Sequence, residues 1–234
     1  MFVKTFRQPK APERALIERG AHGYFYLQRL RVGNIPTRLP HIRALVEGRK
    51  VLHVGCTDFP VFDPSNNLHI QIADVCGSLD GLDTDRAGME QLATHVAGRY
   101  FSTPDEVTDA YDLVLVPETI EHVHDIRQFL TALDAIDFKR IFITAPCLLG
   151  WNACFNYHDY PGWRHNLLDG PDDYLEEIHP DHKAWFTPYT LANCVEQFTG
   201  WRISDIAFLE GKRMVSVLCE KQPDPVPAPE PEVF

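Results

Sequence analysis

Short apolar runs alternate with amphipathic segments through the middle of the chain. Residues 51–54 and 113–116 are apolar at almost every position, which is typical of strands buried on both faces of a sheet. Between such runs lie segments with a helical period, as in 86–96, where Met89 and Leu92 share one face. Strands that alternate with helices predict βαβ units, and therefore a mainly parallel sheet in an α/β fold.

The same pattern gives the expected elements. Strands are predicted at 51–54, 79–82, 113–116 and 141–144, and helices at 68–75, 86–96 and 126–136. A further helix is expected to begin at Thr187-Pro188, since threonine is a good N-cap and proline fits the first helical turn. Two apolar runs, 201–209 and 214–219, are joined around Gly211 and predict a C-terminal antiparallel hairpin.

Three segments lie outside this alternation. Residues 1–48 are expected to form an N-terminal helical cap, ahead of a main domain at 49–221. Residues 147–186 lack periodicity and are rich in aromatic residues, His, Asp, Gly and Pro, which is typical of a lid or substrate loop. A surface excursion or a homodimer contact remains open for this segment. The proline-rich residues 222–234 predict a disordered tail.

Composition narrows the partners and the location. A chain of 234 residues with a net charge of −11 is expected to bind a small molecule rather than nucleic acid, because phosphate binding needs clustered Lys and Arg. The six cysteines form no C-x-x-C pair. There is no long uncharged apolar run or signal peptide, so we expect no membrane contact and a cytoplasmic location.

Residues suited to ligand binding follow three of the expected strands. Gly55 ends the first strand and lets the chain turn tightly with no Cβ in the way. Asp83 follows the second strand, where a carboxylate can accept hydrogen bonds from both ribose hydroxyls, although a simple turn aspartate is the alternative. The third strand is followed by Glu118, Glu121 and His122.

Four segments, 51–59, 79–85, 111–123 and 179–191, together resemble the class I S-adenosylmethionine-dependent methyltransferases. Within that family the chain looks closest to the small-molecule branch related to ubiquinone-type O-methyltransferases. The resemblance implies a Rossmann-like, doubly wound, mostly parallel seven-stranded sheet with a C-terminal antiparallel hairpin, and S-adenosyl-L-methionine as cofactor. The chain departs from the family at His53, which replaces an acidic residue, and at Thr57 and Phe59, which replace glycines.

The resemblance also implies a cofactor site along the strand ends. Its expected members are Gly55, Cys56, Thr57, Asp58, Asp83, Thr84, Asp105, Pro117 and Glu118. Asp58 would supply a carboxylate toward the methionine ammonium, or would instead only cap the following turn. Asp105, or a backbone amide of the loop at 101–105, would read the adenine amino group.

Three histidines are candidates for a general base, because an alcohol acceptor must lose its proton as it is methylated. They are His122, His182 and His165, in that order. For His122, a scaffold role in which Glu121-His122 organises the helix start is the alternative. The His and Asp residues of 158–182 have the donor types of a divalent metal site. No H-x-x-x-H or H-E-x-x-H spacing occurs, so no metal is expected.

The sequence therefore predicts an S-adenosylmethionine-dependent methyltransferase (EC 2.1.1.-) that O-methylates a small hydroxylated acceptor, such as a sugar or natural-product intermediate. The altered glycine turn leaves open a catalytically inactive protein of the same fold that binds a nucleoside or acts as a scaffold. A nicotinamide dehydrogenase is a weaker alternative, because the chain lacks G-x-G-x-x-G.

Overall fold

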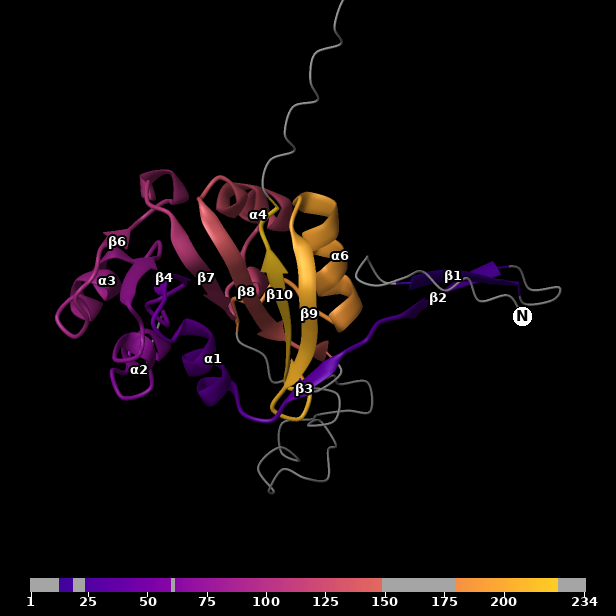
Figure 1. Ribbon diagram of the computed structural model, residues 1–234, viewed down its shortest axis with the longest axis horizontal. Coiled ribbons are helices and arrows are strands. Elements are labelled where there is room, and N and C mark those ends of the chain that lie inside the picture. Colours follow the sequence, from indigo (N-terminus) through magenta and orange to yellow (C-terminus); the bar gives the residue numbers. More distant parts are fainter. Residues whose placement is uncertain (1–12, 19–23, 60–61, 149–179, 223–234) are drawn as a thin grey trace, which may run out of the picture.

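The computed structural model describes residues 13–18, 24–59, 62–148 and 180–222, with side chains from residue 30 onward. Within these ranges the chain forms an eight-stranded sheet and a separate two-stranded sheet, β1–β2 (Figure 1). In the described part of the chain, no helix is both long enough and apolar enough to cross a lipid bilayer.

The strands and helices of the described residues have the following bounds. The strands are β1 (Glu13–Glu18), β2 (Tyr24–Arg29), β3 (Gly33–Ile35), β4 (Lys50–Val54), β5 (Ser78–Leu82), β6 (Tyr100–Phe101), β7 (Tyr111–Pro117), β8 (Phe138–Pro146), β9 (Arg202–Leu209) and β10 (Met214–Glu220). The helices are α1 (Arg38–Val46), α2 (Leu68–Ala73), α3 (Arg86–Leu92), α4 (Ile126–Asp134) and α6 (Pro188–Phe198), with the 3-10 helices η2 (Pro104–Glu106) and η3 (Ile120–His122).

The sheet reverses its direction of growth between β4 and β7. Its strand order is β3-β9-β10-β8-β7-β4-β5-β6, so the chain adds β5 and β6 on one side of β4 and then β7 and β8 on the other. β4 and β7 pair in parallel, with His53 opposite Leu115. The carboxyl ends of the strands at such a switch point flank a crevice where α/β proteins bind ligands.

The predicted fold class is confirmed, with one strand more than expected. β9 and β10 form the expected antiparallel hairpin, and β10 also pairs antiparallel with β8. The turn between them carries positive φ angles at Glu210, Gly211 and Lys212. The eighth strand is β3, which pairs in parallel with β9 at the edge of the sheet.

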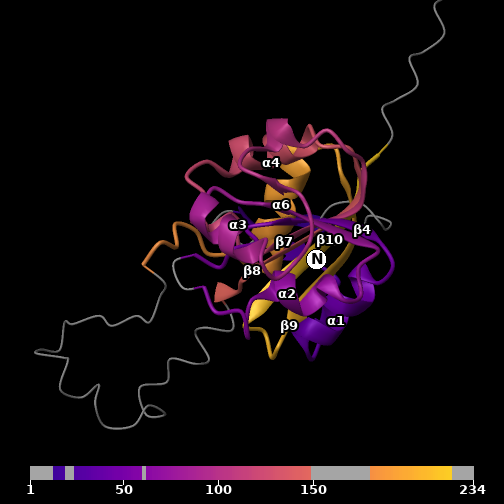
Figure 2. The same ribbon diagram turned by 90° about the vertical axis from the view of Figure 1, so that its left-hand side faces the viewer.

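Side-chain alternation along the strands divides the core between the two faces of the sheet. In β7, Val114 and Val116 pack in the cluster that holds the buried leucines of α4 and α6. Leu113 and Leu115 point to the opposite face, into the cluster that holds the buried residues of α1 and α2. Figure 2 shows α1 and α2 on one side of the sheet and α4 and α6 on the other.

The prediction of an N-terminal helical cap is wrong. Residues 13–18, 24–29 and 33–35 are strands, and the helix in the described part of this segment is α1. The Ala15-Leu16-Ile17 run and the aromatic run at 24–27 fit extended backbone equally well, and cross-strand pairing between β1 and β2 decides the outcome. Short apolar runs do not distinguish helix from strand without knowledge of their partners.

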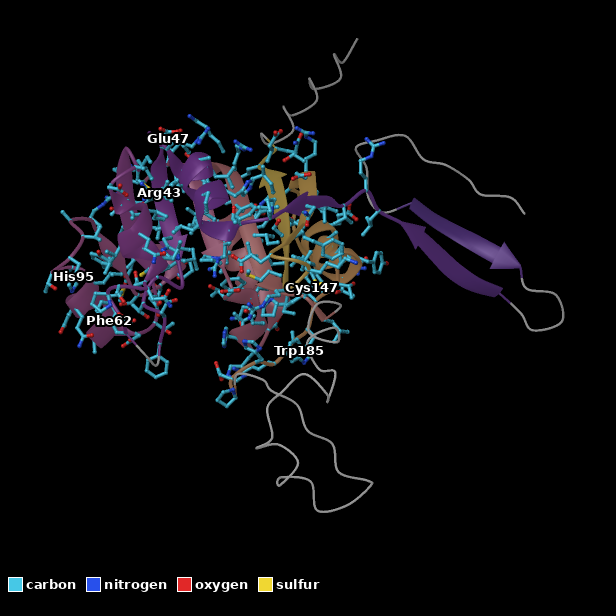
Figure 3. All side chains as sticks on the ribbon, turned by 90° about the horizontal axis from the view of Figure 1, so that it is seen from below. Arg43, Glu47, Phe62, His95, Cys147 and Trp185 are labelled. Carbon is cyan, nitrogen blue, oxygen red and sulfur yellow. The ribbon has the colours of Figure 1, made fainter. Side chains whose placement is uncertain are left out.

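The expected lid, 147–186, leaves and rejoins the sheet at one place. Cys147 forms a parallel bridge with Phe186, and the backbone N of Leu148 donates to the carbonyl O of Phe186 at 2.9 Å. Figure 3 shows Cys147 and Trp185 on the same side of the molecule. Residues 149–179 and the tail from 223 onward lie outside the described residues, so the predictions for a lid and for a disordered tail stay predictions.

The helix after this segment begins where the sequence predicts. Thr187 is the N-cap of α6, and its hydroxyl accepts from the backbone N of Thr190 at 3.2 Å. In return the Thr190 hydroxyl accepts from the backbone N of Thr187 at 2.8 Å. This reciprocal capping box satisfies backbone donors at the start of the helix. It thereby fixes where residues 180–186 approach the sheet.

A buried histidine pair connects β4, which carries His53, with α2, which carries His69. His53 and His69 are 2% and 0% exposed, their rings stack with centroids 5.3 Å apart, and their Nδ1 atoms lie 3.2 Å apart. Burial lowers the pKa of His53 well below the ordinary value of 6.5, and the charge of His69 adds to this effect. Burial also lowers the pKa of His69, to about 4. Both rings are therefore neutral in the folded protein near pH 7.

We predict that this pair makes the protein less stable in mild acid. Below pH 6.5 the two histidines bind protons in the unfolded chain but stay neutral in the folded protein. The contribution of the pair to the free energy of unfolding is therefore fully present above pH 6.5 and decreases as the pH falls toward 4. Measured in urea as the difference between the wild type and His69→Gln, the free energy of unfolding should drop by about 2 kcal/mol or more between pH 7.5 and pH 5.

The matched variants are His69→Gln, which should flatten this pH dependence, and His124→Gln, at an exposed histidine, which should leave it unchanged. An equal slope in all three proteins would contradict the assignment of the effect to the buried pair.

Candidate active site

The ends of β4 and β7 are held together by Thr119. Its Oγ1 lies 3.2 Å from the carbonyl O of Val54 and 3.0 Å from that of Pro117, within hydrogen-bond distance of both strand ends. Gly55, the next residue after β4, has a φ of 74°. A Cβ on Gly55 would collide with Thr119 Oγ1. The sequence predicts a glycine at position 55 so that a ligand can approach closely. The structure gives a further reason for it, because the side chain of Thr119 leaves no room for a Cβ.

Asp83 ties the turn after β4 to the turn after β5. Its Oδ2 accepts from the backbone N of Thr57 at 3.0 Å and from Thr57 Oγ1 at 2.9 Å. Its Oδ1 accepts from the backbone N of Asp85 at 3.0 Å. A carboxylate offers about four acceptor sites, so this half-buried group retains capacity for a ligand hydroxyl. The turn role is thus observed, and the ribose role stays a prediction.

Thr57 replaces a glycine of the family pattern and is accommodated by another glycine. The residue is 1% exposed, and a Cβ on Gly88 of α3 would lie 2.9 Å from Thr57 Cβ. The side chain therefore packs toward α3 and Asp83. Phe59, at the other altered position, is 72% exposed and is not buried in the crevice.

A cavity of about 540 Å³ opens at the carboxyl ends of β4 and β7. One guanidinium lies among its carboxylates: Arg38 Nη1 is 2.8 Å from Glu118 Oε2, and the Arg38 backbone N donates to Glu210 Oε1 at 3.3 Å. The lining residues are Arg38, Leu39, Asp58, Asp63, Asn66, Leu68, Gln71, Glu118 and Glu210.

Asp58 and Glu118 reach this cavity from strained turns. Their φ angles are 58° and 46°, in the left-handed region that residues with a Cβ adopt rarely. Partial shielding from water raises the pKa of the Asp58 carboxyl, and the charges of Glu118 and Asp83 add to this rise against the opposing effect of Arg38. Asn67 Nδ2 holds the turn by donating to the carbonyl O of Cys56 at 2.9 Å. Such strain is typical of binding sites whose surroundings enforce it.

The remaining predicted cofactor residues differ in their accessibility. Cys56 is fully buried, so its backbone rather than its thiol faces the turn. Pro117 is buried at the end of β7, whereas Thr84 and Asp105 are exposed. Asp105 lies in η2, directly after β6, which is the position that the sequence predicts for the adenine loop. Its contact with adenine stays a prediction.

His122 and His182 come from distant parts of the sequence and lie together. Their ring centroids are 4.7 Å apart with the rings nearly perpendicular. His122 Nδ1 lies 3.2 Å from Asp181 Oδ2, and Lys183 Nζ donates to Asp181 Oδ1 at 2.7 Å and to the carbonyl O of His122 at 2.7 Å. This network orients the His122 ring. His165 lies outside the described residues, so its predicted role as a base stays untested.

Glu121 lies behind this histidine pair. It is 0% exposed, and within the described part of the chain neither carboxylate oxygen has a hydrogen-bond partner. Burial raises the pKa of the Glu121 carboxyl to about 8, and the negative charge of Glu118 adds to the rise. One ligand atom from each of Glu121, His122 and His182 lies within 4.8 Å of the other two. We call these three residues the EHH cluster.

Sequence reasoning did not place Arg38 in the candidate site, and it considered Asp181 only as one of several possible metal donors. Arg38 lies in a segment with no motif, and its place in the cavity follows from the packing of α1 beside the turn after β7. Asp181 is adjacent to His182 in the sequence, but its contact with His122 depends on how residues 180–186 return to the sheet. Their charge types were the available signal, and 22 Lys and Arg residues and 33 acidic residues make that signal unspecific.

Neither a protein-family model nor a curated protein matches the chain. Among solved structures, the chain is similar to a SAM-dependent methyltransferase from Archaeoglobus fulgidus, with a TM-score of 0.51, 15% identity, and coverage of 79% of this chain and 95% of that chain. It is also similar to the N-methyltransferase NodS from Bradyrhizobium japonicum WM9 in complex with S-adenosyl-L-homocysteine, with a TM-score of 0.50, 10% identity, and coverage of 79% and 84%. The pyocyanin biosynthetic protein PhzM gives a TM-score of 0.51, 12% identity, and coverage of 79% and 54%.

These similarities establish the fold. The chain has the Rossmann-like α/β fold of the S-adenosylmethionine-dependent methyltransferases, with its polar crevice at the same switch point of the sheet where such folds bind ligands. The similar structures differ in the reactions that their names describe, so the fold does not select the ubiquinone-type branch.

We predict that Gly55→Ala costs more stability than an equivalent change elsewhere. Gly48 has a similar φ of 66°, but a Cβ there would meet nothing within 4 Å. Gly48→Ala should therefore cost about 1–2 kcal/mol from backbone strain, and Gly55→Ala should cost more because it also strikes Thr119. Urea unfolding of both variants measures the difference.

The double variant Gly55→Ala/Thr119→Ala should recover part of the loss, since it removes the hydroxyl that collides. Equal losses in the two single variants would show that Thr119 does not restrict residue 55.

Proposed function

We propose that this protein transfers a methyl group from S-adenosyl-L-methionine to a hydroxyl of a small acceptor molecule. The observation that carries the proposal is the charge pattern at the switch point. Arg38, Asp58 and Glu118 surround one cavity, and Asp83 stands at the end of the neighbouring strand β5. This pattern matches a ligand that has an amino-acid zwitterion at one end and a ribose diol in the middle.

The residues present fit such a cofactor. Arg38 would hold the methionine carboxylate and Asp58 the ammonium, because a planar guanidinium pairs well with carboxylates and an acid pairs with an ammonium group. Asp83 has acceptor capacity beyond its bonds to Thr57 and Asp85. The cavity of about 540 Å³ lies in the range of small-molecule sites. S-Adenosyl-L-homocysteine bound to the similar NodS structure supports the same choice of cofactor.

When bound, the cofactor supplies an activated methyl group on a sulfonium. The chain's own task is to align the acceptor, exclude water, and deal with the acceptor's proton. The EHH cluster is where the described residues can take up that proton or offset the charge left on the oxygen. Asp181 positions His122 for this task through its Nδ1 contact of 3.2 Å.

A small acceptor follows from the surface charge. A net charge of −11 opposes a polyanionic acceptor, and the cavity lining repeats this bias with Asp58, Asp63, Glu118 and Glu210 against Arg38. This proposal includes three expectations: the methyl group goes to an oxygen of the acceptor, the protein is located in the cytoplasm, and it forms a homodimer.

The alternative function is an inactive protein of the same fold that binds a nucleoside or acts as a scaffold. It is favoured by the bonds of Thr57 to Asp83, which occupy part of the predicted ribose carboxylate. Against it, Thr57 packs toward Gly88 and Phe59 is exposed, so neither altered residue fills the crevice. Loss of methyl transfer with retained S-adenosylmethionine binding would identify this alternative.

We predict that Asp83→Ala weakens the binding of S-adenosyl-L-homocysteine and of 5′-methylthioadenosine about 10- to 100-fold. Both compounds contain the ribose, and charge-assisted hydrogen bonds to it are lost. Isothermal titration calorimetry of the full chain measures both affinities. Asp74→Ala, at an exposed carboxylate that follows α2 and pairs with Arg43 of α1, is the control that should bind as the wild type does. Unchanged affinity in Asp83→Ala would exclude the ribose role.

We predict a different outcome for Arg38→Gln. S-Adenosyl-L-homocysteine should bind about tenfold more weakly, whereas 5′-methylthioadenosine, which lacks the amino-acid group, should bind with unchanged affinity. The same titrations separate this variant from Asp83→Ala, which loses both ligands. Equal weakening of the two ligands by Arg38→Gln would mean that Arg38 supports the fold of the cavity rather than the carboxylate.

A further inference from the structure

We propose that the EHH cluster, formed by Glu121, His122 and His182, binds a divalent first-row transition-metal ion. One ligand atom from each residue lies within 4.8 Å of the other two. Ligands about 2.0–2.2 Å from a common ion lie about 3–4 Å from one another, so small rotations of the side chains close the site.

Glu121 is the strongest reason for a cation. The residue is fully buried, and neither of its carboxylate oxygens has a hydrogen-bond partner among the residues that the structure describes. A buried carboxyl group whose oxygens find no partner carries a cost in free energy in either protonation state. The nearby guanidinium of Arg38 is already paired with Glu118 at 2.8 Å. A cation between Glu121 and the histidines would satisfy the carboxylate.

The hydrogen bond of His122 to Asp181 favours metal binding. A neutral imidazole that donates from Nδ1 to a carboxylate carries its lone pair on Nε2, which is the form that binds a metal. Lys183 fixes Asp181 in turn, through the 2.7 Å contact between Nζ and Oδ1. A carboxylate that orients a histidine in this way is a recurrent support of metal sites.

The backbone brings the two halves of the cluster together. η3 carries Glu121 and His122, and the backbone N of Lys183 donates to the carbonyl O of Glu121 at 2.8 Å. This bond places the neighbouring His182 beside η3. The ring of Trp185, labelled in Figure 3, contacts His182 with centroids 5.6 Å apart. The cluster is therefore a fixed feature of the packing between η3 and residues 180–186.

The donor set indicates the kind of ion. Two imidazole nitrogens and one carboxylate oxygen suit Zn²⁺, Mn²⁺, Fe²⁺ or Co²⁺, whereas Ca²⁺ and Mg²⁺ prefer all-oxygen sites. Three protein ligands leave coordination positions for a substrate oxygen. This proposal departs from the expectation of no metal, which was based on spacing along the sequence. His182 is 60 residues from His122 in the sequence but adjacent to it in space.

The role of the ion rests on the proposed function. An ion held by the EHH cluster would lower the pKa of an acceptor hydroxyl and so favour loss of its proton, and the sulfonium that gives up the methyl group would leave as S-adenosyl-L-homocysteine. In this form His122 is a ligand, and the hydroxyl proton leaves to water. The acceptor is then a molecule whose hydroxyl can coordinate a metal ion. Metal binding itself does not depend on this role.

Co²⁺ binding to the full-length protein, purified with EDTA and dialysed, tests the site. We expect one equivalent of Co²⁺ to bind, with visible d–d absorption and a rise in the thermal unfolding midpoint. Glu121→Gln, which keeps the shape of the buried side chain, should weaken Co²⁺ binding about 10- to 100-fold or more. His124→Gln, an exposed histidine next to the cluster, is the matched control and should bind as the wild type does.

The outcomes separate the metal site from the proposed function. Absence of stoichiometric Co²⁺ binding, or equally tight binding by Glu121→Gln, would overturn the site, since histidines elsewhere would then hold the ion. His182→Gln serves as the second variant if Glu121→Gln fails to fold, and it should lose the d–d absorption. Calorimetry with S-adenosyl-L-homocysteine in EDTA runs beside these tests. Cofactor binding without Co²⁺ binding refutes the metal site alone, and Co²⁺ binding without cofactor binding leaves the metal site standing while the proposed function fails.

Discussion

The carboxyl ends of β4, β5 and β7 are tied together by two side chains, and the rest of the site depends on these contacts. Thr119 lies within hydrogen-bond distance of the strand ends of β4 and β7, and Asp83 accepts from both donors of Thr57. The side chains that connect the three strand ends need space, which a Cβ on a neighbouring residue would occupy. Gly55 supplies that room beside Thr119, and Gly88 supplies it beside Thr57.

The turn after β7 serves both halves of the proposed site. Glu118 faces the cavity and pairs with Arg38, and Glu121, three residues later, turns into the interior behind His122. Two carboxylates on one short turn therefore have different environments. Glu118 meets a guanidinium near solvent, whereas Glu121 is buried and has no hydrogen-bond partner among the described residues. Such a division lets one segment position a cofactor and an acceptor at a fixed distance from each other.

Two residues that depart from the family pattern, His53 and Thr57, are each accommodated by a neighbouring residue of a helix. His53 stands where the family has an acidic residue, and it is buried against His69 of α2 as a neutral pair. Thr57 stands where a glycine is usual, and Gly88 of α3 gives it space. His53 Nδ1 lies within hydrogen-bond distance of His69 Nδ1, although His53 Nε2 has no partner among the described residues, and Thr57 fits sterically beside Gly88. The altered turn is thus compatible with an open crevice.

The sequence by itself determined the alternation of strands and helices from residue 50 to 146, the α6 capping box, the terminal hairpin and the residues at the strand ends, because these follow from local periodicity and capping chemistry. The tertiary structure decided the rest. β1, β2 and β3 are strands because other strands pair with them, against the helical cap that the sequence predicted. Arg38, Asp181 and the meeting of Glu121 with His182 depend on contacts between segments far apart in the chain, which no local pattern encodes.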